Sequence, residues 1–277
     1  MSLKKIKNYV PEFSIILPTY NRPQILKRAV KSIFNQSFQD FEVIIINDGS
    51  ILDYNETYKD ILTLYPNSKI QIIHNSINLG AALSRNLGIK SAKGKFISFL
   101  DDDDEYLPTF LELTYNILAN TTSSIGFSWS GVKYIFYDKN ESKPVTEKIR
   151  VFFKEYTNKL VLYEELFSIG IGHGFTIKAD SINMVGGFSN QFKTVEDTDL
   201  FFRLIQANYD PVIIPEVSVV VHNHILPRMT GIEMHEIRIK ECQILLERYD
   251  EFLSLYPILR NHFLAHINNL QKEIINS

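Results

Sequence analysis

Short apolar segments alternate with amphipathic helical patterns through the first hundred residues. Segments rich in β-branched and aromatic residues predict buried strands at residues 13–17, 41–46, 70–73 and 96–100. Between these strands the apolar residues recur at helical spacing, as in residues 26–33 and 81–89. This alternation predicts an α/β fold with a parallel sheet and right-handed crossovers.

The parallel alternation stops after residue 108. The patterns that follow predict a helix over 110–118, a strand hairpin in 126–153, a helix over 159–167, a strand at 175–178, a helix over 197–208, and strands at 212–214 and 217–221. Two amphipathic helices are predicted from residue 231 to the end, the second with an apolar stripe through Phe263 and Ile267. We expect an α/β domain over 1–225, with halves at about 12–108 and 122–225, and a helical segment over 226–277.

The composition is that of a globular protein without a basic surface. The 277 residues are 45% hydrophobic, and 29 Lys and Arg against 32 Asp and Glu give a formal charge of −3. This charge provides no field for non-specific binding to nucleic acid, so we expect no nucleic-acid partner. The single cysteine, Cys242, and the lack of an apolar leader or a long apolar run predict a cytoplasmic protein without a transmembrane segment.

Polar and acidic residues follow each of the first predicted strands. They are Pro18-Thr19-Tyr20-Asn21-Arg22, Asn47-Asp48-Gly49-Ser50, Asn78-Leu79-Gly80 and Asp101-Asp102-Asp103-Asp104. Ligands bind outside the carboxyl ends of the strands in an open parallel sheet, so these segments are expected to form one site. Because the site is acidic, its ligand is expected to include a cation.

Neither of the two common phosphate-binding loops is present. No G-x-G-x-x-G follows the first strand, and Phe96 stands where a P-loop needs Ser or Thr. A diphosphate in this site would therefore need a metal bridge. In an extended segment Asp101 and Asp103 would face one way and Asp102 and Asp104 the other, and oxygen ligands suit Mg²⁺ or Mn²⁺. A solvated acidic loop is the alternative.

Separated motifs resemble those of family 2 glycosyltransferases of the GT-A fold. They are FSIILPTYNRPQILKRAVKSIFNQS, FEVIIINDGS, NLGAALSRNLGIKSAKGKFISFLDDDDEYLP, VGGFSN and EDTDLFFRL, within residues 12–225. The resemblance implies a Rossmann-like, mostly parallel central sheet flanked by helices, with a C-terminal helical extension. It also implies sugar transfer from a nucleotide diphosphate, usually UDP, with inversion at the anomeric carbon. The first half would then bind the nucleotide-sugar and the second half the acceptor.

The resemblance also assigns residues to the donor. It implies that Pro18, Thr19 and Tyr20 line the nucleobase and ribose, with Arg22 in the same site, and that Asp48 accepts a hydrogen bond from the base. The implied diphosphate and metal contacts are Arg85, Asp103 as the main metal ligand, Asp101 and Asp102 as ribose and metal supports, and His224, with His222 as its alternative. The structural alternatives are packing of Tyr20 on the sheet edge, a turn cap by Asp48 and a surface ion pair of Arg85.

Asp197 in EDTDLFFRL is the general base that the resemblance implies, with Glu196 and Asp199 as alternatives. Thr194-Val195-Glu196-Asp197 also fits a capping box at the start of a helix, which is the structural alternative. His173, in a Gly-rich turn, is a candidate acceptor contact.

Together these features predict an inverting, metal-dependent glycosyltransferase of the hexosyltransferase type. It would act on a saccharide or lipid-linked saccharide in cell-surface polysaccharide synthesis. The addition of one sugar is expected because the Q-x-x-R-W signature of processive members does not occur. The alternatives are a sugar-phosphate nucleotidyltransferase and a non-catalytic nucleotide-sugar-binding module. The C-terminal helices are expected to cover the domain or to form a homodimer, with peripheral association with the cytoplasmic membrane as the remaining alternative.

Overall fold

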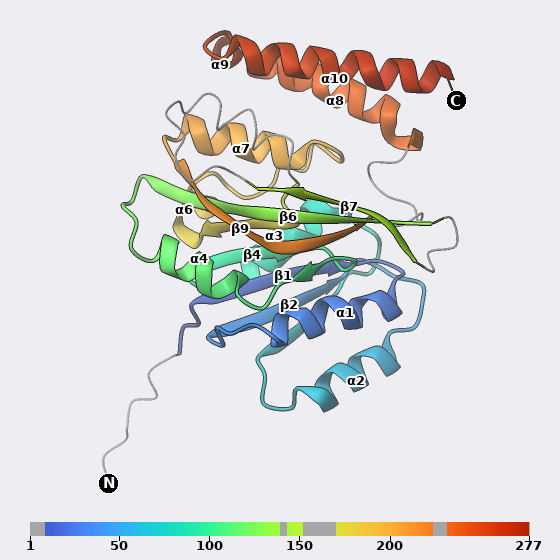
Figure 1. The fold of residues 1–277 in the computed structure, drawn as a ribbon, viewed down its shortest axis with the longest axis vertical. Coiled ribbons are helices and arrows are strands. Elements are labelled where there is room, and N and C mark those ends of the chain that lie inside the picture. The colour runs from blue at the N-terminus through green and yellow to red at the C-terminus, as the bar shows by residue number, and fades with distance from the viewer. Residues whose placement is uncertain (1–8, 139–142, 152–169, 224–231, 277) are drawn as a thin grey trace.

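The computed structural model describes residues 9–138, 143–151, 170–223 and 232–276, and Figure 1 shows their arrangement. The strands are β1 (Phe13–Thr19), β2 (Phe41–Asn47), β3 (Ile70–His74), β4 (Phe96–Leu100), β5 (Glu105–Tyr106), β6 (Ile125–Tyr137), β7 (Pro144–Arg150), β8 (His173–Lys178) and β9 (Asp210–Asn223). The helices are α1 (Pro23–Phe34), α2 (Asn55–Leu64), α3 (Ala81–Ser91), α4 (Phe110–Leu118), α6 (Ala179–Met184), α7 (Glu196–Gln206), α8 (His235–Arg248), α9 (Asp250–Ser254) and α10 (Pro257–Asn276), with a 3-10 turn η1 (Ile232–Met234).

The strands of the first half pair in parallel, as the sequence predicts. β1 lies between β2 and β4, and β2 carries β3 on its other side. In the second half the pairing is mixed, because β8 is antiparallel to β4 and β6 while β6 is parallel to β9. Within the described residues the sheet runs β3-β2-β1-β4-β8-β6-β9-β5, with β7 beside β6. The carboxyl ends of β1, β2 and β4 therefore meet at one edge.

Both faces of the sheet are covered by helices, which explains the unbroken apolar runs in its strands. Because side chains alternate along a strand, Ile16 packs on one face and Ile15 and Leu17 pack on the other. The second face carries α1, α2 and α4, whereas α3, α6 and α7 pack on the first (Figure 1). Each face thus has its own hydrophobic cluster.

The C-terminal helices lie over α7 (Figure 1). The ring of Phe202 on α7 contacts Tyr249, Phe252 and Phe263 at centroid distances of 4.8, 5.3 and 5.8 Å. Ile267, in the stripe predicted for the last helix, is also buried in this cluster. In a single chain these helices therefore cover α7, the first of the arrangements expected for them.

Two of the predicted segments are divided differently in the structure. The segments at 212–214 and 217–221 form one strand, β9, because its register against β6 shifts between Ser130 and Gly131 and the strand continues past Pro215. The C-terminal segment contains α8, α9 and α10 instead of two helices, since Pro257 starts a new helix. The helix predicted over 159–167 lies outside the described residues.

The loop after β2 requires glycine at position 49. Gly49 has φ +68°, and a Cβ there would lie 2.2 Å from the carbonyl carbon of Ile77. Gly186 has a similar φ of +79° but open space around it, so it is a matched control. We expect Gly186→Ala to cost about 1–2 kcal/mol of backbone strain, and Gly49→Ala about 1–3 kcal/mol more from overpacking. Urea unfolding measures the free energy of unfolding of both variants. Equal losses of stability would contradict the close approach of Gly49 to the backbone of Ile77.

Candidate active site

A cavity of about 850 Å³ opens beside the carboxyl ends of β1, β2 and β4. The sequence-predicted residues that line it are Pro18, Thr19, Tyr20, Arg22, Asp48, Arg85, Asp101, Asp102, Asp103 and Asp197. His224 lies outside the described residues. The strand ends therefore meet at one cavity, as expected, while their function as a site and the role of each residue stay predictions.

The acidic run after β4 is a turn and not the extended segment that we expected. The backbone N–H of Asp104 donates to the carbonyl of Asp101 across 3.1 Å, which closes the turn. Asp101 and Asp104 therefore lie near each other, instead of on opposite sides of a strand. The predicted alternation of the four carboxylates was wrong because the strand ends at Leu100.

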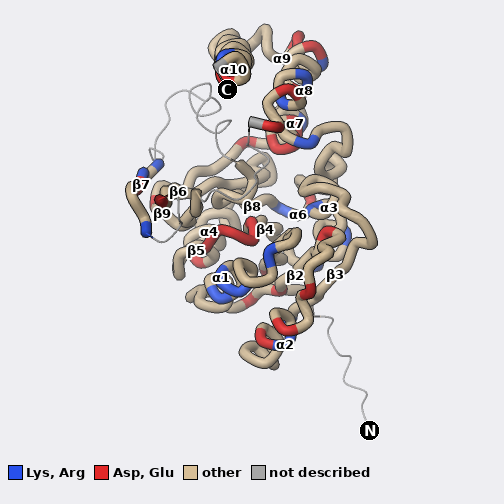
Figure 2. Tube along the Cα trace, turned by 90° about the vertical axis from the view of Figure 1, so that its right-hand side faces the viewer, with Lys and Arg blue, Asp and Glu red and all other residues tan. Residues whose placement is uncertain are grey.

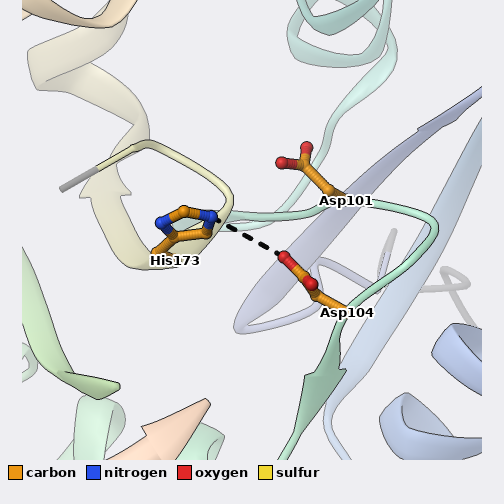
Figure 3. A group of neighbouring side chains, drawn as sticks. All are labelled: Asp101, Asp104 and His173. Atoms are coloured by element: carbon orange, nitrogen blue, oxygen red, sulfur yellow. Dashed lines mark ion pairs between the residues drawn. The ribbon is translucent and has the colours of Figure 1, made fainter. Parts of the chain in front are cut away.

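Asp101, Asp104 and His173 lie close enough together that they could hold a metal ion (Figure 3). Each offers one ligand atom, and these atoms lie within 4.8 Å of one another. His173 Nε2 is 3.8 Å from Asp104 Oδ2, and burial lowers the pKa of the His173 ring. The neutral imidazole that binds metals is thereby favoured. Gly172 leaves room for Asp101, because a Cβ at position 172 would lie 2.2 Å from Asp101 Oδ2.

Asp102 and Asp103 turn towards the loop after β1. Arg22 Nη1 donates to Asp102 Oδ1 at 3.2 Å and to Asp103 Oδ2 at 2.8 Å. Thr19 Oγ1 donates to Asp102 Oδ2 at 2.6 Å, and Arg28 of α1 donates to the backbone carbonyl of Asp103. Figure 2 shows this acidic segment beside the basic residues of α1. Burial raises the pKa of Asp102 to about 6.

The Asp48 carboxylate holds the loop that leads into α3. It accepts hydrogen bonds from the backbone N–H groups of Leu79 and Gly80, each at 2.8 Å, and from Asn75 Nδ2 at 2.8 Å. It also lines the cavity, so the expected contact with the nucleobase stays a prediction. Tyr20 is 43% exposed and lines the cavity, instead of being packed into the sheet edge.

Arg85 joins the two acidic sides of the cavity. Its Nη2 donates to Asp101 Oδ1 at 2.9 Å and its Nη1 donates to Glu196 Oε1 at 3.0 Å. The residue is 6% exposed, so the surface ion pair that was its alternative does not describe it. Burial and the neighbouring carboxylate of Asp197 raise the pKa of Glu196 to about 7, although Arg85 opposes this shift.

The three candidate bases of EDTDLFFRL have different surroundings. Asp197 lines the cavity and accepts the backbone N–H of Thr198 at 2.7 Å, and burial raises its pKa. Asp199 is fully buried, where it accepts the Tyr249 hydroxyl at 2.8 Å and Arg203 Nε at 2.8 Å. Its contacts hold helices together, and it does not line the cavity.

The capping-box interpretation of Thr194 is wrong. The N-cap of α7 is Val195, which makes no side-chain capping hydrogen bond. The Thr194 hydroxyl donates instead to Glu241 Oε2 on α8, at 2.6 Å. The helix begins one residue later than a box starting at Thr194 requires.

His222 is held within the protein through both ring nitrogens. Nδ1 is 2.6 Å from the Tyr137 hydroxyl and Nε2 is 2.8 Å from Glu105 Oε1. Its backbone N–H donates to Asp104 Oδ1 at 3.0 Å. His222 thus positions the acidic turn instead of presenting its ring to the cavity.

Sequence reasoning missed several residues of the cavity wall. Lys193, Thr194, Glu233, Met234 and Arg238 also line it. The last three lie in or next to the C-terminal helices, whose apolar pattern gave no sign that they reach the site. His173 was expected near an acceptor, but its proximity to Asp101 and Asp104 depends on a turn that no periodicity reveals.

The sequence model described as glycosyl transferase family 2 matches residues 14–183. The chain belongs to glycosyl transferase family 2.

Two curated relatives illustrate the similarity. An uncharacterized glycosyltransferase of Rickettsia bellii is 26% identical over 98% of this chain and 41% of its own length. WcaA of Escherichia coli K12, a glycosyl transferase provisionally assigned to colanic acid biosynthesis, is 27% identical over 77% of this chain and 74% of its own length. The chain spans less than half of the Rickettsia bellii and Rickettsia felis relatives, at 41% and 33% of their lengths.

Solved structures show that this family 2 chain has the GT-A fold. TarS residues 1–349 of S. aureus, in complex with UDP-GlcNAc, match with a TM-score of 0.65 and 19% identity over 94% of this chain and 72% of that one. The mannosyltransferase PcManGT of Pyrobaculum calidifontis, in complex with GDP-Man and Mn²⁺, matches with a TM-score of 0.64 and 18% identity over 94% and 70%. Over the described part of this chain, every helix is too short or too polar to cross a membrane.

The raised pKa of Glu196 predicts a pH effect on stability in metal-free buffer. The pKa is about 7 in the folded chain and 4.5 ordinarily, so between these values the folded state keeps a proton that the unfolded state has released. The free energy of unfolding contributed by Glu196 therefore falls as pH rises from about 4.5 to about 7, and is level outside that window.

Glu196→Gln keeps the size of the side chain and cannot titrate. We expect the stability of this variant relative to the parent to rise across the same pH window. Urea unfolding at a series of pH values measures the difference. A difference that is level across this window and falls with rising pH below about 4.5 would mean that the ion pair with Arg85 outweighs burial.

Proposed function

We propose that this chain is a metal-dependent, inverting glycosyltransferase. It moves one sugar from a nucleotide-diphospho-sugar, most simply a UDP-sugar, to a saccharide or lipid-linked saccharide acceptor. The proposed setting is cell-surface polysaccharide synthesis in the cytoplasm. The assignment of WcaA to colanic acid biosynthesis supports the pathway, and the UDP-GlcNAc bound to TarS supports the donor class.

The observation that carries the proposal is the pairing of two acidic sides within one cavity. One side is the turn of Asp101 and Asp104 with His173, and the other is the start of α7 with Asp197. Arg85 spans them through Asp101 and Glu196. We propose that the donor diphosphate binds at the first side and that the Asp197 carboxylate approaches the anomeric carbon from the other side, which is the arrangement that direct displacement needs.

The side chains of Asp101, Asp104 and His173 offer ligand atoms that fit a divalent cation of the Mg²⁺ or Mn²⁺ type. Two carboxylates and a neutral imidazole are ligands that Mn²⁺ accepts, and PcManGT was solved with Mn²⁺. We propose Asp101, Asp104 and His173 as the ligands. Asp103 pairs with Arg22 and is not in this group, so its implied role as main ligand is the competing assignment. When bound, the cation neutralises charge on the leaving diphosphate.

The protein residues then act on the acceptor. Asp197 takes the proton of the acceptor hydroxyl as that oxygen bonds to the anomeric carbon and the bond from carbon to the diphosphate oxygen breaks. A raised pKa makes the Asp197 carboxylate a better proton acceptor than an ordinary aspartate. Arg85 keeps this end of α7 against the donor side, and Thr19 and Tyr20 border the space proposed for the nucleoside.

The metal assignment predicts different effects at Asp101 and Asp103. Asp101→Asn should weaken Mn²⁺-dependent binding of UDP by about 10- to 100-fold, because it removes a ligand charge. Asp103→Asn should weaken it less, because Asp103 lies outside the group of side chains that we propose as metal ligands. Calorimetry with UDP and Mn²⁺ measures both. A larger loss of UDP affinity in Asp103→Asn would instead favour Asp103 as the main metal ligand, as the family resemblance implies.

The base assignment predicts a loss of turnover without a loss of donor binding. Asp197→Asn should reduce transfer by about 10²- to 10⁴-fold while UDP and Mn²⁺ still bind. Asp199→Asn is the matched control, and it should lower the melting temperature because it disturbs the contacts with Tyr249 and Arg203.

The transfer assay first needs a donor, found by screening UDP- and GDP-sugars for metal-dependent hydrolysis. Near-parental turnover of Asp197→Asn would contradict Asp197 as the general base and favour Glu196 in that role. Donor binding by the parent without hydrolysis or transfer would support the non-catalytic binding module instead.

A further inference from the structure

The C-terminal helix α8 holds the loop that leads into α7. Glu241 on α8 is 7% exposed, and its Oε1 accepts the backbone N–H of Lys193 at 2.8 Å. Its Oε2 accepts both the backbone N–H and the hydroxyl of Thr194, at 2.8 and 2.6 Å. A carboxylate that accepts from two consecutive amides fixes both the distance and the orientation of the peptide that carries them.

These bonds hold the two residues that precede the N-cap of α7. Val195, the N-cap, makes no side-chain hydrogen bond, and Glu196 and Asp197 follow directly in the first turn. The negative charge of Glu241 beside this helix start also favours the helix dipole. The same helix holds α7 again at Asp199, through the hydroxyl of Tyr249. In the sequence, Asp197 therefore lies between residues 193–194, which bond to Glu241 of α8, and Asp199, which bonds to Tyr249.

We infer that Glu241 is a positioning residue, which fixes the start of α7 so that the Asp197 carboxylate faces the cavity. This inference rests on the proposed function of Asp197. The inference gives the C-terminal helices a role in the proposed active site, since the hydrogen bonds to residues 193–194 come from Glu241 of α8. The donor side of the cavity has its own supports in Arg22 and Thr19, and it does not depend on Glu241.

Glu241→Gln tests this role in the full chain. Its carbonyl oxygen still accepts from Lys193, but its amide nitrogen cannot accept from the Thr194 N–H. We expect kcat to fall by about 10- to 100-fold, while UDP affinity with Mn²⁺ changes by less than about twofold. In an Asp197→Asn background the same change should cause no further loss of kcat. Glu247→Gln, at an exposed position on the same helix, is the matched control and should resemble the parent.

Hydrogen exchange gives a second readout that does not need activity. Amides in residues 192–199 should exchange faster in Glu241→Gln than in Glu247→Gln, while those of residues 18–22 keep the parental rate. Unchanged exchange over 192–199, parental kcat, or a loss of UDP affinity equal to the loss of kcat would each overturn the inference. If the parent transfers no sugar, the proposed function fails, and the exchange rates still decide whether Glu241 holds the start of α7.

Discussion

The buried guanidinium of Arg85 is the contact on which the rest of the site depends. It bonds Asp101 at the end of β4 and Glu196 at the start of α7, a residue 111 positions away in the chain. Removing one partner from a buried ion pair typically costs about 3–5 kcal/mol, because the remaining charge has no compensation. Without Arg85 the two acidic sides of the cavity would repel each other. With it, they form the walls of one site.

The helix that carries Arg85 is itself anchored to the α7 side of the molecule. The next residue, Asn86, donates to the carbonyl of Phe188 and accepts its backbone N–H, both at 2.8 Å. Gly187 has φ +74°, and a Cβ there would lie 2.6 Å from Asn86 Oδ1. The VGGFSN motif therefore holds α3 through the backbone of Phe188, and the ring of Phe188 lies 5.7 Å from the Arg85 guanidinium. The motif does not line the cavity.

Four adjacent carboxylates are tolerated after β4 because the turn gives them different partners. Asp102 and Asp103 meet Arg22, Asp101 meets Arg85, and Asp104 accepts the backbone N–H of His222. Burial and, to a smaller extent, repulsion from Asp103 keep the pKa of Asp102 raised to about 6, although Arg22 opposes this shift. A bound cation would offset this negative charge, which supports the proposed metal site on physical grounds.

The sequence predicted the strands and the location of the site more fully than its contacts, for a physical reason. Burial produces continuous apolar runs in strands that are covered on both faces, so the strand at 96–100 could be inferred locally. The convergence of Asp48 and Asp101 at one edge follows from the parallel order of the strands. Partner choice has no period. The turn that brings Asp101 to His173, and the bonds from Glu241 to Thr194, join segments whose spacing is set by loops.

A local signal existed only at Gly172, where the missing Cβ makes room for Asp101. Its meaning depends on the position of β4, so it becomes readable only once the sheet is assembled.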